Sequence, residues 1–201
     1  MNKIVHDALI LTAFTLVLGL ILGVVYNITL PAITAANEAT TKAAYQAVFE
    51  DAGEFADVDG FDSAAATEVV TAEGYSDTID NVVEAKDASG ATLGYVITVT
   101  AKDGSQGSIT FSVGIQNDGT VNGYSITSIS ETPGLGMKAQ EEEFYSQFEG
   151  KNVEKFEVTK TGEAGDNMIN AITGSTITSK AMANGCNAAL VYFRAELGGA
   201  Q

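Results

Sequence analysis

An uncharged segment near the start of the chain constrains its folding most. Nineteen consecutive residues, from Ala8 to Tyr26, carry no charge. As a helix they would extend roughly 28 Å, about the thickness of a membrane's hydrocarbon core. The apolar part of a secretory signal peptide is shorter, about 7–15 residues, although Ala35-Ala36 offers a loose cleavage site. We therefore expect an uncleaved single-pass membrane anchor over residues 1–33 and one domain outside the membrane over residues 34–201.

The charges around this segment predict its orientation and exclude one class of partner. Lys3 precedes the segment, and no basic residue follows it until Lys42. This asymmetry favours a cytoplasmic N-terminus and an extracytoplasmic domain in the cell membrane. The net charge of −16 argues against nucleic acid as a partner, because phosphate backbones would be repelled. Membrane lipid is the partner that the anchor implies.

The inventory of reactive side chains excludes most redox and hydrolytic sites. The chain has one cysteine, Cys186, and one histidine, His6. One cysteine cannot build an iron–sulfur centre, and a histidine beside the membrane cannot serve a catalytic triad in the domain. Cys186 is expected to be a small buried thiol. We expect no catalytic residue and no metal site, so an organic cofactor must carry any electrons that the chain transfers.

The pattern after the anchor predicts an α+β domain with a twisted, mainly antiparallel sheet and flanking helices. Strand-like runs rich in Val, Ile, Thr and Tyr alternate in part, as expected for a sheet covered on one face. Asn117-Asp-Gly119 is a hairpin signal between two of them. We expect a helix over 37–49, an irregular connection over 50–66, strands over 67–71, 82–86, 94–101, 108–115 and 121–129, a helix over 138–148, a strand over 155–158 and a C-terminal helix over 181–197.

A hydroxyl-rich segment, Asn170-Ala-Ile-Thr-Gly-Ser-Thr-Ile-Thr-Ser-Lys180, precedes that last helix. A helix start presents unpartnered N–H groups and partial positive charge, and Gly174 allows a tight turn. The segment can therefore seat a phosphate. It can equally be a helix cap supplied by Thr178 or Ser179. The residues of the segment that could hydrogen-bond a phosphate or be esterified by it are Thr173, Ser175, Thr176, Thr178 and Ser179.

A second segment, Glu131-Thr-Pro-Gly-Leu-Gly-Met-Lys138, follows the predicted strands. Together with Thr173-Gly-Ser-Thr176 and the anchor, it resembles the FMN-binding domain family. Within that family the likeness is greatest to the G subunit of Rnf-type ion-translocating ferredoxin:NAD oxidoreductases. The C subunit of the related Nqr quinone reductases comes second. The resemblance implies a membrane-anchored flavoprotein that relays electrons as one redox subunit of a translocase.

In the family, a threonine is esterified to the phosphate of FMN, and Thr176 stands at its position here. Asn170 and Ser175 depart from the usual aspartate and alanine, and Ser175 offers a rival attachment oxygen. The likeness also implies that the second segment lines the flavin: Thr132 and Gly134 by hydrogen bonds, Leu135 as an apolar wall and Gly136 by close backbone approach. Lys138 is expected either to pair with phosphate or reduced flavin or to face solvent. Residues of both segments expected at the cofactor are Thr173, Gly174, Ser175, Thr176, Thr178, Glu131, Thr132, Pro133, Gly134, Leu135, Gly136 and Lys138.

The resemblance further implies partners: the A, B, C, D and E subunits of an Rnf complex, and a flavin transferase during maturation. Three other readings remain open from the sequence. The chain can be the C subunit of a sodium-translocating NADH:quinone reductase or a stand-alone extracytoplasmic FMN electron carrier. It can also be a non-redox anchored binding domain whose hydroxyl-rich segment only caps a helix.

Overall fold

The computed structural model describes residues 3–163 and 165–198, which divide into two compact units between Thr40 and Thr41. Helix α1 (Lys3–Val48) begins in the first unit and ends in the second. The helix expected over residues 37–49 is confirmed up to Val48, as the last part of α1. It continues from the apolar segment without a break, because α1 accommodates Pro31.

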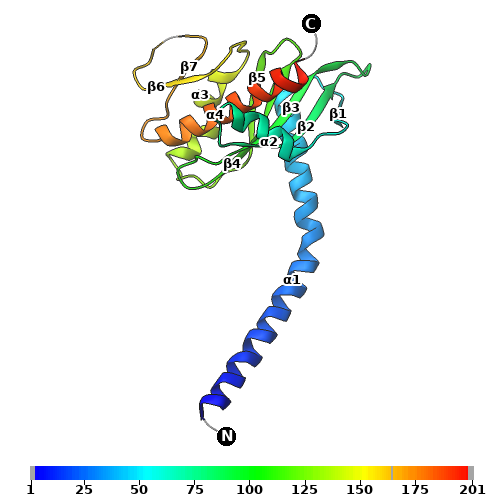
Figure 1. Cartoon of the computed structure of the whole chain (residues 1–201), viewed down its shortest axis with the longest axis vertical. Helices are drawn as coiled ribbons and strands as arrows, with labels where there is room; N and C mark the ends of the chain where they lie inside the picture. Colours follow the sequence, from blue (N-terminus) through cyan, green and yellow to red (C-terminus); the bar gives the residue numbers. More distant parts are fainter. Residues whose placement is uncertain (1–2, 164, 199–201) are drawn as a thin grey trace. The chain divides into compact units, whose positions relative to one another are not determined.

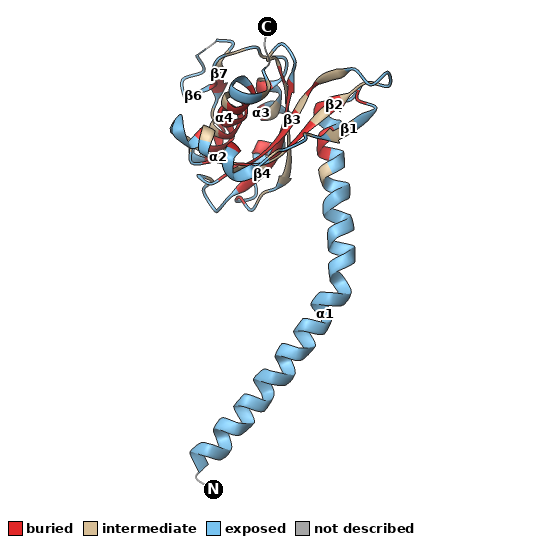
Figure 2. Cartoon of the chain, turned by 45° about the vertical axis from the view of Figure 1, so that its right-hand side comes forward, coloured by how far each residue is buried: buried red, intermediate tan, exposed pale blue. Residues whose placement is uncertain are grey.

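In the first unit, α1 is exposed throughout, as the pale blue ribbon in Figure 2 shows. It is the one helix of the described residues long and apolar enough to cross a membrane. Its threonine hydroxyls bond to carbonyls one turn earlier: Thr12 donates to Ala8 at 2.8 Å, and Thr29 donates to Val25 at 2.9 Å. Such internal bonds satisfy polar groups where hydrocarbon offers no partner.

The second unit is built on a five-stranded antiparallel sheet in which neighbours in sequence are neighbours in space. This confirms the expected sheet, including the hairpin at Asn117–Gly119, where Gly119 has φ +85°. The expected strand positions are correct from residue 82 onward, with small shifts at their ends. The strands are β1 (Glu54–Asp57), β2 (Thr78–Lys86), β3 (Thr92–Ala101), β4 (Ile109–Gln116) and β5 (Val121–Ser128).

Both faces of the sheet are covered, which corrects the expectation of a single covered face. Adjacent residues of a strand point to opposite faces. Ile97 belongs to the main core under α4 (Thr176–Tyr192), whereas Val96 belongs to a smaller core under the end of α1. The α1 residues Tyr45 and Val48 fill that smaller core. The strand residues that face either side of the sheet are apolar, so apolar and polar residues alternate only in part. The sequence therefore did not reveal that both faces are covered.

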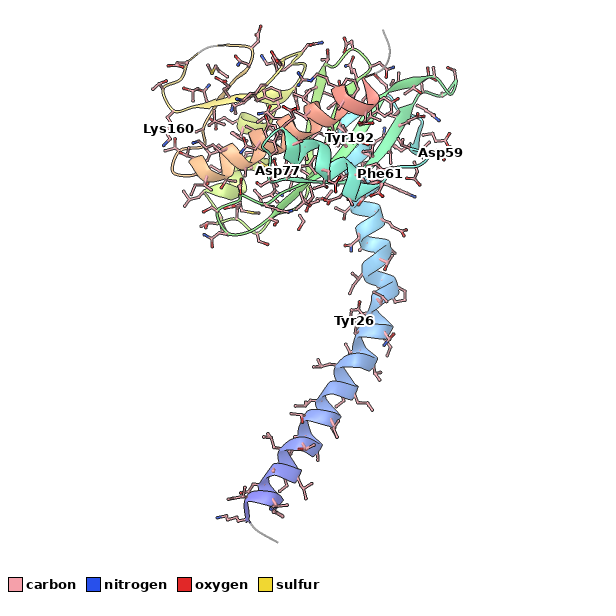
Figure 3. All side chains as sticks on the ribbon, viewed as in Figure 1. Tyr26, Asp59, Phe61, Asp77, Lys160 and Tyr192 are labelled. Carbon is pink, nitrogen blue, oxygen red and sulfur yellow. The ribbon has the colours of Figure 1, made fainter. Side chains whose placement is uncertain are left out.

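Helix α2 (Ser63–Ala72) lies where the sequence predicted a strand over 67–71. The irregular connection expected over 50–66 is also corrected, because it contains β1 and the start of α2. The carboxylate of Asp62 accepts the N–H groups of Ala64 (2.8 Å) and Ala65 (3.2 Å), so it caps this helix. Ala66 and Val70, one turn apart, enter the main core. This cap and spacing override the strand preference of the β-branched residues. Phe61, just before α2, packs edge-on against Tyr192 of α4 with ring centroids 6.4 Å apart (Figure 3).

The chain between the sheet and α4 is made of short pieces. The single helix expected over 138–148 is divided into a 3₁₀ turn η1 (Gly136–Gln140), α3 (Glu142–Tyr145) and a 3₁₀ turn η2 (Ser146–Phe148). The break falls at Glu141, whose extended backbone interrupts the helix. The strands β6 (Glu157–Thr159) and β7 (Met168–Asn170) pair in parallel. A π-helical turn η3 (Phe193–Leu197) follows α4.

Candidate functional site

A tight turn joins β7 to α4 and defines the hydroxyl-rich segment. The N–H of Ser175 donates to the carbonyl of Ile172 at 2.9 Å, and Gly174 has φ +78°. A positive φ at the third residue of such a turn is available to glycine at little cost. The turn ends at Ser175, so α4 begins at Thr176, five residues before the expected start (orange in Figure 1). Thr176 is thus the first residue of a long helix.

The start of α4 has no side-chain cap. Ser175 occupies the cap position, but its hydroxyl makes no capping hydrogen bond. The capping role weighed for Thr178 or Ser179 is wrong because both lie within the first turn of the helix. Ser179 instead accepts the N–H of Ile172 at 2.9 Å and donates to the carbonyl of Ser175 at 3.0 Å, which fixes the turn. The leading N–H groups of α4 are left for solvent or a ligand.

Burial divides the five hydroxyl side chains of this segment into two groups. Thr178 and Ser179 are fully enclosed, and Ser175 is 7% exposed. The oxygens Ser175 Oγ and Thr178 Oγ1 lie 2.8 Å apart and share a hydrogen bond. Thr173 is exposed and Thr176 is half-buried. Only these last two present a hydroxyl that a reactant from solvent can approach.

The second segment is held by a buried carboxylate. Glu131 is 5% exposed, and its Oε1 accepts the backbone N–H groups of Ser105 at 2.6 Å and Gln106 at 3.2 Å. This contact ties the segment to the glycine turn between β3 and β4. Thr132, Pro133 and Gly134 form the exposed tip, where the carbonyl of Thr132 accepts the N–H of Leu135 at 3.1 Å.

The second segment and the hydroxyl-rich segment approach each other closely at two glycines, Gly136 and Gly174. A Cβ placed on Gly136 would lie 2.5 Å from Glu131 Oε2 and 2.8 Å from Thr178 Oγ1. A Cβ placed on Gly174 would lie 3.2 Å from Leu135 Cδ2. The structure therefore brings Leu135 and Gly136 against the hydroxyl-rich segment, with Glu131 packed against Gly136. The hydrogen-bonding roles expected for Thr132 and Gly134 toward a flavin stay predictions.

Two large apolar side chains remain exposed beside Thr176. In the described residues after Thr40, Leu135 at 42% and Ile177 at 58% are the large hydrophobics that stay exposed. Leu135 was expected as an apolar wall, and Ile177 was missed. Nothing in the sequence indicated that Ile177 is exposed, because an apolar residue in a helix is usually buried.

A groove of about 390 Å³ lies beside the turn. It contains Lys138 and Thr173, so these two predicted residues share one hollow. Gln147, which the sequence did not indicate, lines the groove and is hydrogen-bonded to Asn170 on the same wall. The Oε1 of Gln147 accepts the N–H of Asn170 at 2.7 Å, and the Nε2 of Gln147 donates to the carbonyl of Asn170 at 3.3 Å. The groove is lined by Lys138, Glu141, Glu143, Phe144, Gln147, Asn170, Ala171, Ile172 and Thr173.

Sequence comparison identifies the region that contains both segments. Residues 104–191 match the FMN-binding domain family. The G subunit of the Na⁺-translocating ferredoxin:NAD⁺ oxidoreductase complex of Acetobacterium woodii is 39% identical over 109 residues, which are 53% of this chain and 52% of that protein. The G subunit of the proton-translocating ferredoxin:NAD⁺ oxidoreductase complex of Clostridium ljungdahlii is 39% identical over 108 residues, 54% of this chain and 57% of that protein. The chain spans about half the length of the curated relatives it matches.

Solved structures show the same fold. The C subunit of the Na⁺-translocating NADH-quinone reductase of Parabacteroides distasonis superposes with a TM-score of 0.54 at 23% identity, covering 75% of this chain and 80% of that one. NqrC of Shewanella oneidensis gives a TM-score of 0.51 at 17% identity, covering 75% and 84%. Residues 104–191, in which the two segments contact each other, are thus similar to the FMN-binding domain family and to the G subunits of ion-translocating oxidoreductases.

Proposed function

We propose that this chain is the FMN-carrying subunit of an Rnf-type ion-translocating ferredoxin:NAD oxidoreductase, with FMN joined through its phosphate to Thr176. The observation that carries the proposal is the contact between the two segments inside the region that matches the FMN-binding domain family. The identity of 39% to the G subunits of two such complexes favours the Rnf type. The likeness to the Nqr C subunits lies in the fold, at 17% and 23% identity.

The residues present fit a phosphate ester at Thr176. Its hydroxyl is accessible at the first position of α4, where the helix start has no side-chain cap. The N–H groups and partial positive charge of such a helix start stabilise the charge that a phosphodiester retains. Thr173, the other accessible hydroxyl, lies within the turn and is not part of the helix. We therefore assign the attachment to Thr176.

The surroundings of Thr176 also fit an aromatic ring system. Ile177, next to Thr176 in α4, and Leu135, close to Gly174, offer exposed apolar surface, and the groove beside Thr173 offers a hollow that Lys138 also lines. Gly136 keeps the second segment close to α4, where a side chain would force the two apart. When bound, FMN accepts and donates one or two electrons, and the protein's part is to hold and expose it.

The membrane anchor gives covalent attachment a physical purpose. We place the N-terminus in the cytoplasm and the FMN-binding domain outside it, because Lys3 precedes the apolar part of α1 and no basic residue follows until Lys42. A cofactor held only by weak contacts would be lost to the exterior. The other Rnf subunits would supply and remove electrons, and a flavin transferase would attach the flavin.

Intact-mass measurement of the full chain tests the proposal. Wild type, Thr176→Ala and Thr173→Ala are expressed in a host that contains a flavin transferase. We expect a mass increase of one esterified FMN in the wild type and in Thr173→Ala, and its loss in Thr176→Ala. Denaturing gels viewed under ultraviolet light should show fluorescence in the same two samples. A mass increase that persists in Thr176→Ala would overturn the assignment, and a wild type without flavin would favour a non-redox domain.

A further inference from the structure

We propose that the hydrogen bond between Ser175 and Thr178 determines which hydroxyl is modified, by holding the Ser175 oxygen away from the flavin donor. This inference rests on the proposed function, because it concerns the choice between neighbouring hydroxyls during attachment. The choice is real in this chain, since Ser175 and Thr176 are adjacent and both carry a hydroxyl.

The chemistry of attachment does not by itself distinguish the two side chains. The acceptor oxygen forms a bond to the flavin-bearing phosphorus of an FMN anhydride, and the anhydride P–O bond breaks. The leaving phosphate takes the electron pair, and the hydroxyl proton passes to a base of the transferase. Serine and threonine hydroxyls have the same donor and acceptor capacity. Selection must therefore come from where the two oxygens lie.

The structure separates the two oxygens by burial and by bonding. Ser175 is 7% exposed and its Oγ lies 2.8 Å from Thr178 Oγ1, whereas Thr176 is half-buried at the start of α4. Thr178 is fully enclosed, so it provides a fixed partner. An oxygen engaged in this pair points into the domain and cannot at the same time approach a phosphorus atom from solvent.

The second segment covers the hydrogen-bonded side chains of Ser175 and Thr178. A Cβ on Gly136 would lie 2.8 Å from Thr178 Oγ1, so the Gly136 backbone covers this hydroxyl. On the other side, the carbonyl of Ser175 accepts from the hydroxyl of Ser179 at 3.0 Å, which fixes the backbone of the turn. With its backbone fixed, the Ser175 side chain can expose its oxygen only by rotating away from Thr178. The hydrogen bond opposes that rotation.

Rescue of attachment at Ser175 tests this inference. In a Thr176→Ala background, the intact pair should hold the flavin on Ser175 to a small fraction of the wild-type amount at Thr176. Adding Thr178→Val removes the partner hydroxyl with little change in shape, and a hydrogen bond of about 1 kcal/mol lost corresponds to about fivefold more outward-facing Ser175. We expect about fivefold more flavin on Ser175 in Thr176→Ala/Thr178→Val than in Thr176→Ala, measured by fragment-ion mass spectrometry of the full chain. Thr176→Ala/Thr178→Ser keeps a hydroxyl and should resemble Thr176→Ala.

The outcomes separate the failure of this inference from that of the proposed function. Thr178→Val alone should show the circular dichroism spectrum of the wild type and a cooperative unfolding transition, which shows that the variant folds. Flavin on Ser175 at equal levels with and without the Thr178 hydroxyl would overturn the inference, as would its absence from both while Thr178→Val folds like the wild type. A wild type without flavin at Thr176 would instead overturn the proposed function.

Discussion

Asp77 is a buried carboxylate in the interior of the domain (Figure 3). It is 1% exposed, and neither of its oxygens has a hydrogen-bond partner among the described residues. Burial raises the pKa of Asp77 from 3.8 to about 6, because the charged form loses its hydration. Burial also raises the pKa of the Cys186 thiol, and the nearby Asp77 charge adds to that effect. Cys186 is thus the buried, unreactive thiol that the sequence predicted.

The raised pKa of Asp77 predicts how stability depends on pH. The folded state binds the proton of the Asp77 carboxyl more tightly than the unfolded state does. The stabilisation that this protonation gives the folded state is therefore present below pH 3.8 and is lost as pH rises through about 6. A pKa shift of this size corresponds to a loss of about 3 kcal/mol in the free energy of unfolding over that pH range. We therefore expect Asp77→Asn to be more stable than the wild type by up to that amount at pH 7.5 and by little at pH 4.

Urea unfolding at several pH values measures this difference directly. Glu68→Gln, which removes an exposed carboxylate from α2, serves as the matched control and should follow the wild type. The wild type and the variants share all other carboxylates, so the difference in their free energies of unfolding reports the titration of the substituted residue. A constant difference between Asp77→Asn and the wild type from pH 4 to pH 7.5 would show that folding leaves the pKa of Asp77 unshifted.

At the residue scale, the sequence was sufficient to single out the hydroxyl-rich segment but not to tell which of its hydroxyl residues are buried. The composition of residues 170–180 and the likeness to the FMN-binding domain family indicated the segment. Which oxygens are buried depends on where the helix begins, and that depends on the turn at Gly174. Gln147 escaped notice because a glutamine that bonds to a distant backbone has no local pattern.

Asn187 joins α4 to the segment that leads into β6. Its side chain accepts the N–H of Phe156 at 2.8 Å and donates to the carbonyl of the same residue at 2.9 Å. Asn187 is 2% exposed. Asn187→Ala would leave both backbone groups buried without partners, so we expect a loss of about 3 kcal/mol in the free energy of unfolding. Asn184→Ala on the same helix, at a half-buried position, should cost about 0.5 kcal/mol or less. Equal losses in denaturant titrations of the two variants would contradict this role for Asn187.

At the scale of elements, local pattern predicted the central strands and failed where capping or tertiary pairing decides. Alternation and a hairpin signal are properties of neighbouring residues, so β3, β4 and β5 were predictable. Helix α2 was not, because strand-forming side chains at residues 67–71 concealed the Asp62 cap. The parallel pair β6–β7 joins short strands separated by a long loop, and no local pattern encodes such pairing.

At the scale of the whole molecule, one chain combines a helix long and apolar enough to cross a membrane with a unit built on an antiparallel sheet. The sequence predicted the helix and the sheet because each has its own composition: an uncharged run in one and an acidic α+β pattern in the other. It also predicted a helix over 37–49, but not that Tyr45 and Val48 of that helix would fill a second, smaller core. That packing makes the end of the anchor helix part of the domain's own structure.

The proposed orientation predicts opposite labelling of two engineered cysteines. Ala72→Cys places a thiol on the exposed end of α2, and Asp7→Cys places one just before the uncharged run. A membrane-impermeant maleimide should label Ala72→Cys in intact cells and Asp7→Cys only after lysis, because the charge rule keeps the N-terminus inside. The wild type is the control, since burial raises the pKa of the enclosed Cys186 thiol and should leave it unlabelled in both conditions. The reverse pattern would place the second unit in the cytoplasm and overturn the proposed orientation.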